Sequence, residues 1–142
     1  MINKLSEQNL DELFELDNTI FNLDPYSKEQ IRDELTQPNR IYLGYYKNNK
    51  LVAFVGVSVT IDFCDIIKIG VLSEYRKLGI AKALVTELIK ILTSLGVKKI
   101  LLEVREKNVG AILFYKKMGF NEIATRKNYY VGDNAKILAL EI

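Results

Sequence analysis

The sequence has 142 residues, which predicts one domain spanning residues 1–142 with enough apolar material to bury a core. Its 20 basic and 18 acidic residues leave a net charge of +2, a weaker basic bias than nucleic-acid-binding modules usually show. Histidine is absent, which removes the commonest general base and the commonest metal ligand. No cluster has zinc-ligand spacing, so we expect no metal site.

The single cysteine, Cys64, excludes an internal disulfide and fits a reducing compartment. We expect it at a turn or strand end, without a nucleophilic role. Residues 1–10 lack the continuous apolar stretch of a signal peptide, and no apolar run approaches the ~20 residues that a membrane helix needs. We therefore expect a soluble, cytoplasmic protein without membrane or nucleic-acid partners, as a monomer or weak dimer.

Apolar residues at helical spacing predict a first helix over residues 5–20. Ser27 followed by Gln30 resembles a capping box and predicts a second helix that ends near Thr36. Residues 41–46 and 51–60 have strand composition, with a hairpin turn at 47–50 between them. A third strand is expected over residues 65–71.

The second half continues with a long helix, whose apolar face is Leu78, Ala81, Leu84, Val85, Leu88, Leu92 and Leu95, ended by Gly96. The apolar run in 99–104 predicts a central strand covered on both faces. A helix over 109–118 is ended by Gly119, and strands over 121–130 and 136–142 flank a turn at 132–134. The order ααβββαβαββ predicts a mixed α/β sheet flanked by helices, whose third and fourth strands are parallel.

The segment Arg76-Lys77-Leu78-Gly79-Ile80-Ala81 lies between a predicted strand and the long helix. Small residues at 79 and 81 let a ligand approach the backbone, and the free N–H groups of the first helical turn favour an anion. Arg76, Lys77 and Lys82 add positive charge. A pyrophosphate site is one interpretation and a plain strand-to-helix turn is the other. The segment lacks the ending of a P-loop and the three glycines of a dinucleotide fingerprint.

The pattern Arg76-x-x-Gly79-x-Ala81 resembles the acyl-CoA pyrophosphate loop of the GNAT acetyltransferases, and the predicted element order is also theirs. Leu102-Glu103-Val104-Arg105-x-x-Asn108, Ala111-x-x-x-Tyr115-x-x-x-Gly119-Phe120 and 126–130 extend the resemblance, which is greatest to the bacterial ribosomal-protein-alanine N-acetyltransferases in that superfamily. It implies acetyl-CoA as cosubstrate, and the following cofactor-binding residues: Ile69, Gly70, Val71, Arg76, Lys77, Leu78, Gly79, Ile80, Ala81, Lys82, Asn108 and Tyr115.

Glu103 lies near the carboxyl end of a parallel strand, where open α/β sheets bind ligands. At pH 7 only about a tenth of an α-amine with pKa ~7.8 is free base, so the reaction needs a proton acceptor. Partial burial would raise the pKa of Glu103 and improve it as a base. The resemblance assigns Glu103 as general base, acting directly or through a water. The alternative is a carboxylate paired with Arg105 or a neighbouring lysine.

Two further residues flank the short helix after Glu103. Asn108 can be an ordinary helix N-cap, contact the CoA arm as the resemblance implies, or do both. The resemblance assigns Tyr115 as the general acid that protonates the leaving sulfur, whereas a core aromatic is the structural alternative. It also implies that the strand edge at 69–71 binds the pantetheine arm, where two parallel strands splay apart.

The acceptor side is predicted from aromatic residues. Asp24-Pro25-Tyr26-Ser27 resembles a Pro-Trp-Ser segment of N-terminal acetyltransferases, so Tyr26 could wall the acceptor groove or pack on the core. Tyr129 and Tyr130 alternate on a strand, so one should face the groove. The resemblance implies transfer to the N-terminal α-amine of a protein, with a ribosomal protein beginning with Ala as the acceptor.

Three alternatives remain open from the sequence. The acceptor could be a lysine or a small-molecule amine, the chain could be a non-catalytic acyl-CoA-binding module, or it could associate with RNA. Lys116, Lys117, Arg126 and Lys127 read as a solvated face that could attract an anionic cofactor.

Overall fold

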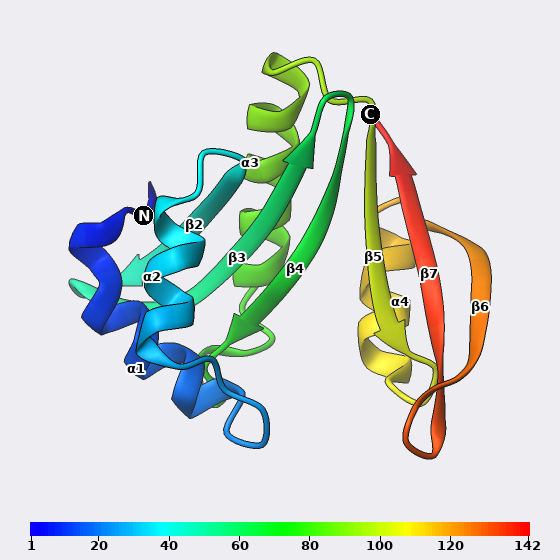
Figure 1. Ribbon diagram of the computed structural model, residues 1–142, viewed down its shortest axis with the longest axis horizontal. Helices are drawn as coiled ribbons and strands as arrows, with labels where there is room; N and C mark the ends of the chain where they lie inside the picture. The colour runs from blue at the N-terminus through cyan, green and yellow to red at the C-terminus, as the bar shows by residue number, and fades with distance from the viewer.

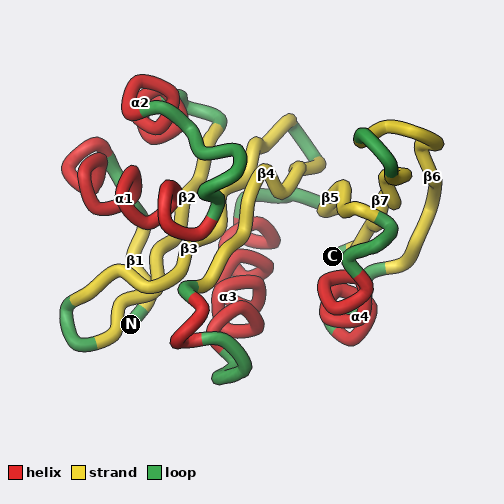
Figure 2. Tube along the Cα trace, turned by 90° about the horizontal axis from the view of Figure 1, so that it is seen from below, coloured by secondary structure: helices red, strands yellow, loops and turns green.

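The computed structural model describes residues 1–142 and contains one seven-stranded sheet with helices on both faces (Figures 1 and 2). Its elements in chain order are β1 Ile2–Lys4, α1 Leu10–Ile20, α2 Lys28–Thr36, β2 Arg40–Lys47, β3 Lys50–Thr60, β4 Phe63–Val71, α3 Ile80–Ser94, β5 Lys99–Arg105, α4 Val109–Lys117, β6 Asn121–Tyr130 and β7 Asp133–Glu141. Short 3-10 turns, Glu7–Asn9 and Ser73–Tyr75, precede α1 and α3. The predicted order of ten elements is confirmed.

The structure adds one strand that the sequence analysis missed. Residues 2–4 form β1, which pairs antiparallel with β2 at the edge of the sheet. Three residues are too few to show an alternating pattern, so the first helix was predicted to begin too early. The chain instead passes through the 3-10 turn, and α1 begins at Leu10.

The strand order is β1-β2-β3-β4-β5-β7-β6, and every pair except β4–β5 is antiparallel. The predicted parallel pairing of β4 and β5 is confirmed, but it covers only residues 63–65 against 99–101. Beyond that point the two strands separate, as the wedge between them in Figure 1 shows. The register of β3 with β4 shifts between Gly56–Lys68 and Val57–Ile66, which makes Ile67 a bulge at the start of the separation.

Helices α1 and α2 lie on one face of the sheet and α3 and α4 on the other (Figure 2). The core fills both layers around β2, β3 and β4. The prediction that β5 is covered on both faces is wrong. Ile100, Leu102 and Val104 are buried, whereas Glu103 on the alternate face is exposed. Helices α1 and α2 lie over β2–β4 and leave this face of β5 open (Figure 2).

Local signals explain most element boundaries. Ser27 and Gln30 form the predicted capping box, in which Gln30 N–H donates to Ser27 Oγ at 3.1 Å. Asn48 and Asn49 both have positive φ, as a tight hairpin turn requires. The last turn was placed too late, since the turn is at 131–132 and β7 already begins at Asp133. There the Asp133 carboxylate accepts the N–H groups of Lys107 and Asn134 and is held in the strand.

Two predicted core positions of the long helix are wrong. Leu78 and Leu95 lie outside α3 and are exposed, because the helix begins at Ile80 and ends at Ser94. Cys64 is the second residue of β4 and is buried, and its burial raises the pKa of the thiol to about 12. None of the helices has the length and apolar character needed to cross a bilayer.

Packing of α1 on β4 generates a stability prediction at Gly70. A Cβ atom there would lie 2.9 Å from Ile20 Cγ2 and 3.0 Å from Phe21 Cε2. Gly70→Ala should therefore push the end of α1 off the sheet and lower the free energy of unfolding by about 1–3 kcal/mol. The matched control is Gly110→Ala in the first turn of α4, where nothing lies within 4 Å. Helix propensity makes that change neutral or stabilising. Urea unfolding measures both, and equal effects would contradict the packing argument.

Candidate functional site

The site is built on the opening between β4 and β5. Leu72 N–H donates to Val52 O of β3 at 2.9 Å. Because strand groups alternate, the N–H and C=O of Ile69 and Val71 point away from β3, toward the opening. Those of Gly70 point to β3. The predicted pantetheine-binding edge at 69–71 thus offers groups from its first and third residues, while Gly70 makes room for α1.

The turn before α3 has an unusual backbone. Gly79 is the N-cap of α3 with φ of 80° and ψ of 11°, a left-handed conformation that glycine adopts without strain. Lys77 also has a positive φ, of 62°. No side chain caps the helix, so the first N–H groups of α3 have no protein partner. Such a helix start favours an anionic ligand.

A cavity of about 460 Å³ lies against this turn, between α3 and α4. Its lining is Val71, Tyr75, Arg76, Lys77, Gly79, Ile80, Ala81, Lys82, Phe114, Lys117 and Met118. All but one of the residues predicted from the 76–82 segment are therefore brought together. The exception is Leu78, which points to solvent. Arg76 Nε donates to Val71 O at 3.0 Å, which ties the turn to the end of β4.

A second cavity of about 290 Å³ fills the opening itself. Its lining comes from β4, β5, α4 and the ends of α1 and β6: Phe21, Ile66, Ile67, Lys68, Ile69, Leu102, Glu103, Val104, Arg105, Asn108, Ala111, Tyr115 and Tyr130. Both predicted catalytic residues are on this list. The two cavities lie next to each other along α4, because the consecutive residues Phe114 and Tyr115 line the first and the second cavity respectively.

Glu103 lies on the open face of β5 with 34% of its side chain exposed. Arg126 Nη1 lies 3.4 Å from Glu103 Oε1, and 58% of the arginine side chain is exposed. The predicted alternative was pairing with Arg105 or a lysine, and the structure instead gives Arg126. An ion pair this exposed contributes about 0–1 kcal/mol and can open.

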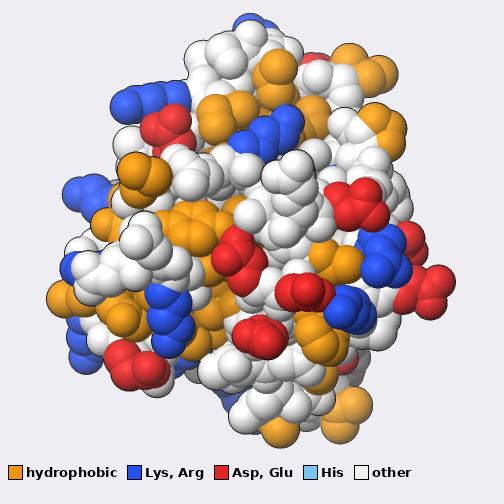
Figure 3. Space-filling view, turned by 90° about the vertical axis from the view of Figure 1, so that its left-hand side faces the viewer, with side chains coloured by type: hydrophobic (Ala, Val, Ile, Leu, Met, Phe, Trp, Pro, Cys, Tyr) orange, Lys and Arg blue, Asp and Glu red, His pale blue; other side chains and the backbone are white.

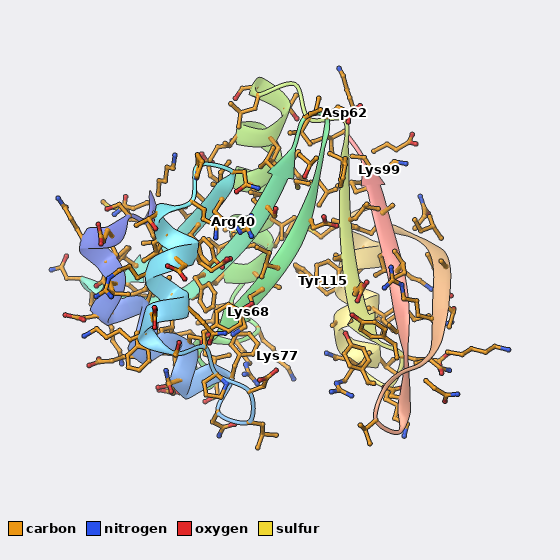
Figure 4. All side chains as sticks on the ribbon, in the orientation of Figure 1. Arg40, Asp62, Lys68, Lys77, Lys99 and Tyr115 are labelled. Carbon is orange, nitrogen blue, oxygen red and sulfur yellow. The ribbon has the colours of Figure 1, made fainter.

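Tyr115 is on the buried face of α4, packed edge-on against Phe114 and Phe120 at ring-centroid distances of 5.2 and 5.4 Å. Burial raises the pKa of its phenol, so the phenol stays protonated across the physiological range. Its hydroxyl makes no hydrogen bond within the protein and is available to the cavity. Figure 4 shows Tyr115 in the space between β4 and β5.

Asn108 is the N-cap of α4, and its Oδ1 accepts a hydrogen bond from Ala111 N–H at 3.3 Å. The same residue lines the second cavity. The predicted capping role of Asn108 is confirmed, and this hydrogen bond holds the Asn108 side-chain amide at the wall of the opening.

Of the three aromatic residues predicted on the acceptor side, only Tyr130 lines the second cavity. Tyr130 lines the second cavity beneath the Arg105 guanidinium, whose carbon lies 4.0 Å from the ring centroid. Tyr129 is 52% exposed and does not line the cavity. Tyr26 is also absent from the lining. It lies behind Lys68, whose Nζ is 3.6 Å from the Tyr26 ring centroid.

Sequence reasoning missed Lys68 and Phe21 in the cavity wall. Lys68 is the only charged residue in the apolar run from Ile66 to Val71, a signal that could have marked it. The contribution of Phe21 depends on how α1 docks and has no local signal. Lys117 was predicted as part of a solvated face that could attract an anionic cofactor, and the structure places it in the lining of the basic cavity. On the side of the molecule that carries α1, acidic and basic side chains are interspersed (Figure 3).

Comparison with known proteins adds family evidence to this geometry. Residues 8–120 match the acetyltransferase (GNAT) family. A ribosomal protein bS18-alanine N-acetyltransferase of Haemophilus ducreyi is 33% identical over 147 aligned positions, which cover 99% of each chain.

Solved structures agree with the fold. The crystal structure of the ribosomal-protein-S18-alanine N-acetyltransferase from Escherichia coli matches 100% of this chain and 93% of its own, with a TM-score of 0.92 and 29% identity. The PaiA N-acetyltransferase of Thermoplasma acidophilum, solved in complex with coenzyme A, has a TM-score of 0.84 at 22% identity, covering 100% of this chain and 98% of its own. At that identity the likeness concerns the fold alone. The chain therefore belongs to the GNAT family of N-acetyltransferases, whose members use acetyl-CoA.

Proposed function

We propose that this enzyme transfers the acetyl group of acetyl-CoA to the N-terminal α-amine of a protein, with a ribosomal protein beginning with Ala as the acceptor. The observation that carries the proposal is a pair of neighbouring cavities, both lined in part by β4 and α4. One is basic and lies at a helix start, and the other brings a carboxylate and a phenol together. Relatives named as acetyltransferases of bS18 alanine indicate the acceptor class.

The basic cavity suits the coenzyme's anionic end. The free N–H groups at the start of α3 and the cations of Arg76, Lys77, Lys82 and Lys117 would hold its phosphates. The outward-facing groups of Ile69 and the N–H of Val71, whose carbonyl already accepts a hydrogen bond from Arg76, would pair with the amides of the pantetheine arm, as a short strand pairs with a sheet edge. Asn108 would contact the same arm from across the opening.

The coenzyme supplies an acetyl group activated as a thioester. Glu103 would take a proton from the acceptor ammonium, directly or through a water, so that the free amine can bond to the acetyl carbon, and the nitrogen would release a second proton to solvent as the amide forms. Tyr115 would give its proton to the sulfur as the carbon–sulfur bond breaks, and would regain one from solvent. Backbone donors of β4 would stabilise the oxyanion. Holding both reactants in one opening makes the step effectively unimolecular.

The acceptor would enter from the face that carries α1. There Phe21, Lys68 and Tyr130 line the cavity, whereas the basic cavity lies on the side of α3 and α4. Because donor and acceptor would approach from opposite faces, both could be bound at the same time. The acetyl group would then pass directly between them, without a covalent acetyl-enzyme intermediate.

The acceptor class is tested with acetyl-CoA and peptides that have free N-termini beginning with Ala, Ser, Met or Gly. Matched peptides with blocked N-termini and one internal lysine serve as controls. We expect acetylation at the α-amine, fastest for Ala, located by mass spectrometry. Acetylation confined to ε-amines would overturn the N-terminal assignment, and no turnover of any amine would favour a binding module.

The catalytic roles predict losses in kcat. Glu103→Gln and Tyr115→Phe should each lower kcat about 10²- to 10⁴-fold, because a positioned proton acceptor or donor contributes that much. The Kd for acetyl-CoA should change little. Glu141→Gln and Tyr45→Phe make the same chemical changes outside both cavities and should leave kcat intact. A variant of either predicted catalytic residue that keeps full kcat removes that residue from the mechanism.

The turn before α3 predicts a loss of cofactor affinity. Gly79→Val places a branched side chain at the helix start, and we expect acetyl-CoA affinity to fall about tenfold or more, equivalent to 1.4 kcal/mol. Backbone strain at positive φ also costs roughly 1–2 kcal/mol of stability. Gly96→Val is matched for this strain, since Gly96 has φ of +83° and open surroundings at the other end of α3. Calorimetric titration showing equal affinity in both variants would reject the assignment of the turn.

A further inference from the structure

A buried ion pair joins α1 to β4 beside the acceptor face of the opening. Lys68 Nζ lies 2.6 Å from Asp17 Oδ1, with 13% of the lysine side chain and 0% of the aspartate side chain exposed. Figure 4 shows Lys68 between α1 and β4. The mechanism proposed above uses neither charge, so the pair requires its own explanation.

The same two side chains also hold the segment after α1. The second carboxylate oxygen of Asp17 accepts the backbone N–H of Tyr26 at 2.8 Å. The Lys68 ammonium lies 3.6 Å from the Tyr26 ring centroid and 4.6 Å from that of Phe21. One carboxylate and one ammonium therefore fix both ends of the 21–26 segment against β4.

Burial of this pair is a poor source of stability. Taking two charges out of water costs about as much as their attraction returns, and apolar replacements are often neutral or better. What a fully bonded pair does provide is one defined geometry. Here its partners are specific atoms of a loop that has no secondary structure of its own between α1 and α2.

The fixed segment forms one wall of the reaction cavity. Phe21 and Lys68 line it together with Glu103 and Tyr115. Lys68 directly follows the bulge at Ile67, where β4 leaves β5. The alternate position Gly70 faces Ile20 and Phe21, so Lys68 and Gly70 lie on the α1 face of β4.

We propose that Asp17 and Lys68 are positioning residues for the acceptor: their ion pair holds the 21–26 segment as a rigid wall that aligns the incoming amine with Glu103. This inference rests on the acceptor side proposed above. It does not require the acceptor to be a protein N-terminus, because any amine that enters from this face meets the same wall.

Steady-state kinetics of Lys68→Met and Asp17→Asn test the proposal, using whichever amine the parent enzyme acetylates fastest. We expect the KM for the acceptor to rise about tenfold or more, because small displacements of a positioning wall are costly. The KM for acetyl-CoA should stay within about twofold, since the donor cavity contains neither residue. Lys68→Arg keeps the cation and should restore part of the acceptor KM.

The double variant and a stability control separate positioning from general destabilisation. If the two residues act as one unit, Asp17→Asn with Lys68→Met should be no worse than either single change. Each single variant leaves one buried charge without its partner, which could unfold the protein, whereas the double variant removes both charges. Val97→Ala lowers stability in the core beyond α3 and should leave the acceptor KM unchanged.

An unchanged acceptor KM, or one that rises in parallel with the acetyl-CoA KM and with loss of stability as in Val97→Ala, overturns the proposal. Independent, additive effects of Asp17 and Lys68 would also overturn it. If the parent acetylates only ε-amines, the N-terminal assignment fails, while the same comparison on that amine still decides the role of the pair.

Discussion

The site depends on one irregularity, the short pairing of β4 with β5. Two parallel strands that pair at only three positions leave backbone N–H and C=O groups facing the gap between them. Such groups must find partners or remain hydrated. A ligand with its own amides can supply them, which explains why an otherwise regular sheet opens where chemistry is proposed. The bulge at Ile67 starts the separation, and the right-handed twist of each strand widens it.

Chain topology then gives the two faces of the opening different character. The crossover from β4 to β5 places the start of α3 at the end of β4, so unpaired N–H groups and four basic side chains gather on that face. The other face receives the end of α1 and the β6–β7 hairpin, which contribute aromatic rings, and there Asp17 of α1 pairs with Lys68 of β4. In the proposed mechanism, the sheet separates an anionic donor from an amine acceptor, and the two meet only at its gap.

Elements with strong periodicity or capping signals could be predicted from sequence, as α2 and α3 illustrate. The Gly79 turn could be located because its residues are consecutive. Three features could not be predicted, because each depends on tertiary packing. These are the exposure of Glu103, which follows from what α1 and α2 leave uncovered, the pairing of Glu103 with Arg126, and the entry of Phe21 into the cavity wall. Alternation predicts that one of Tyr129 and Tyr130 faces the opening, but which one could not be predicted, since the strand is irregular between Arg126 and Tyr130.

The two proposed catalytic groups differ in their exposure to water because the two faces of β5 are covered differently. Tyr115 projects from a helix that packs on the core, so water is excluded from its ring and its proton is held more tightly. Glu103 projects from the uncovered face of β5, where solvent and the exposed guanidinium of Arg126 reach it. A proton accepted there has a route to water, whereas the proton of Tyr115 is kept for a group inside the gap. The proposed acid and the proposed base thus differ in which side of β5 each occupies, in a chain that contains no histidine.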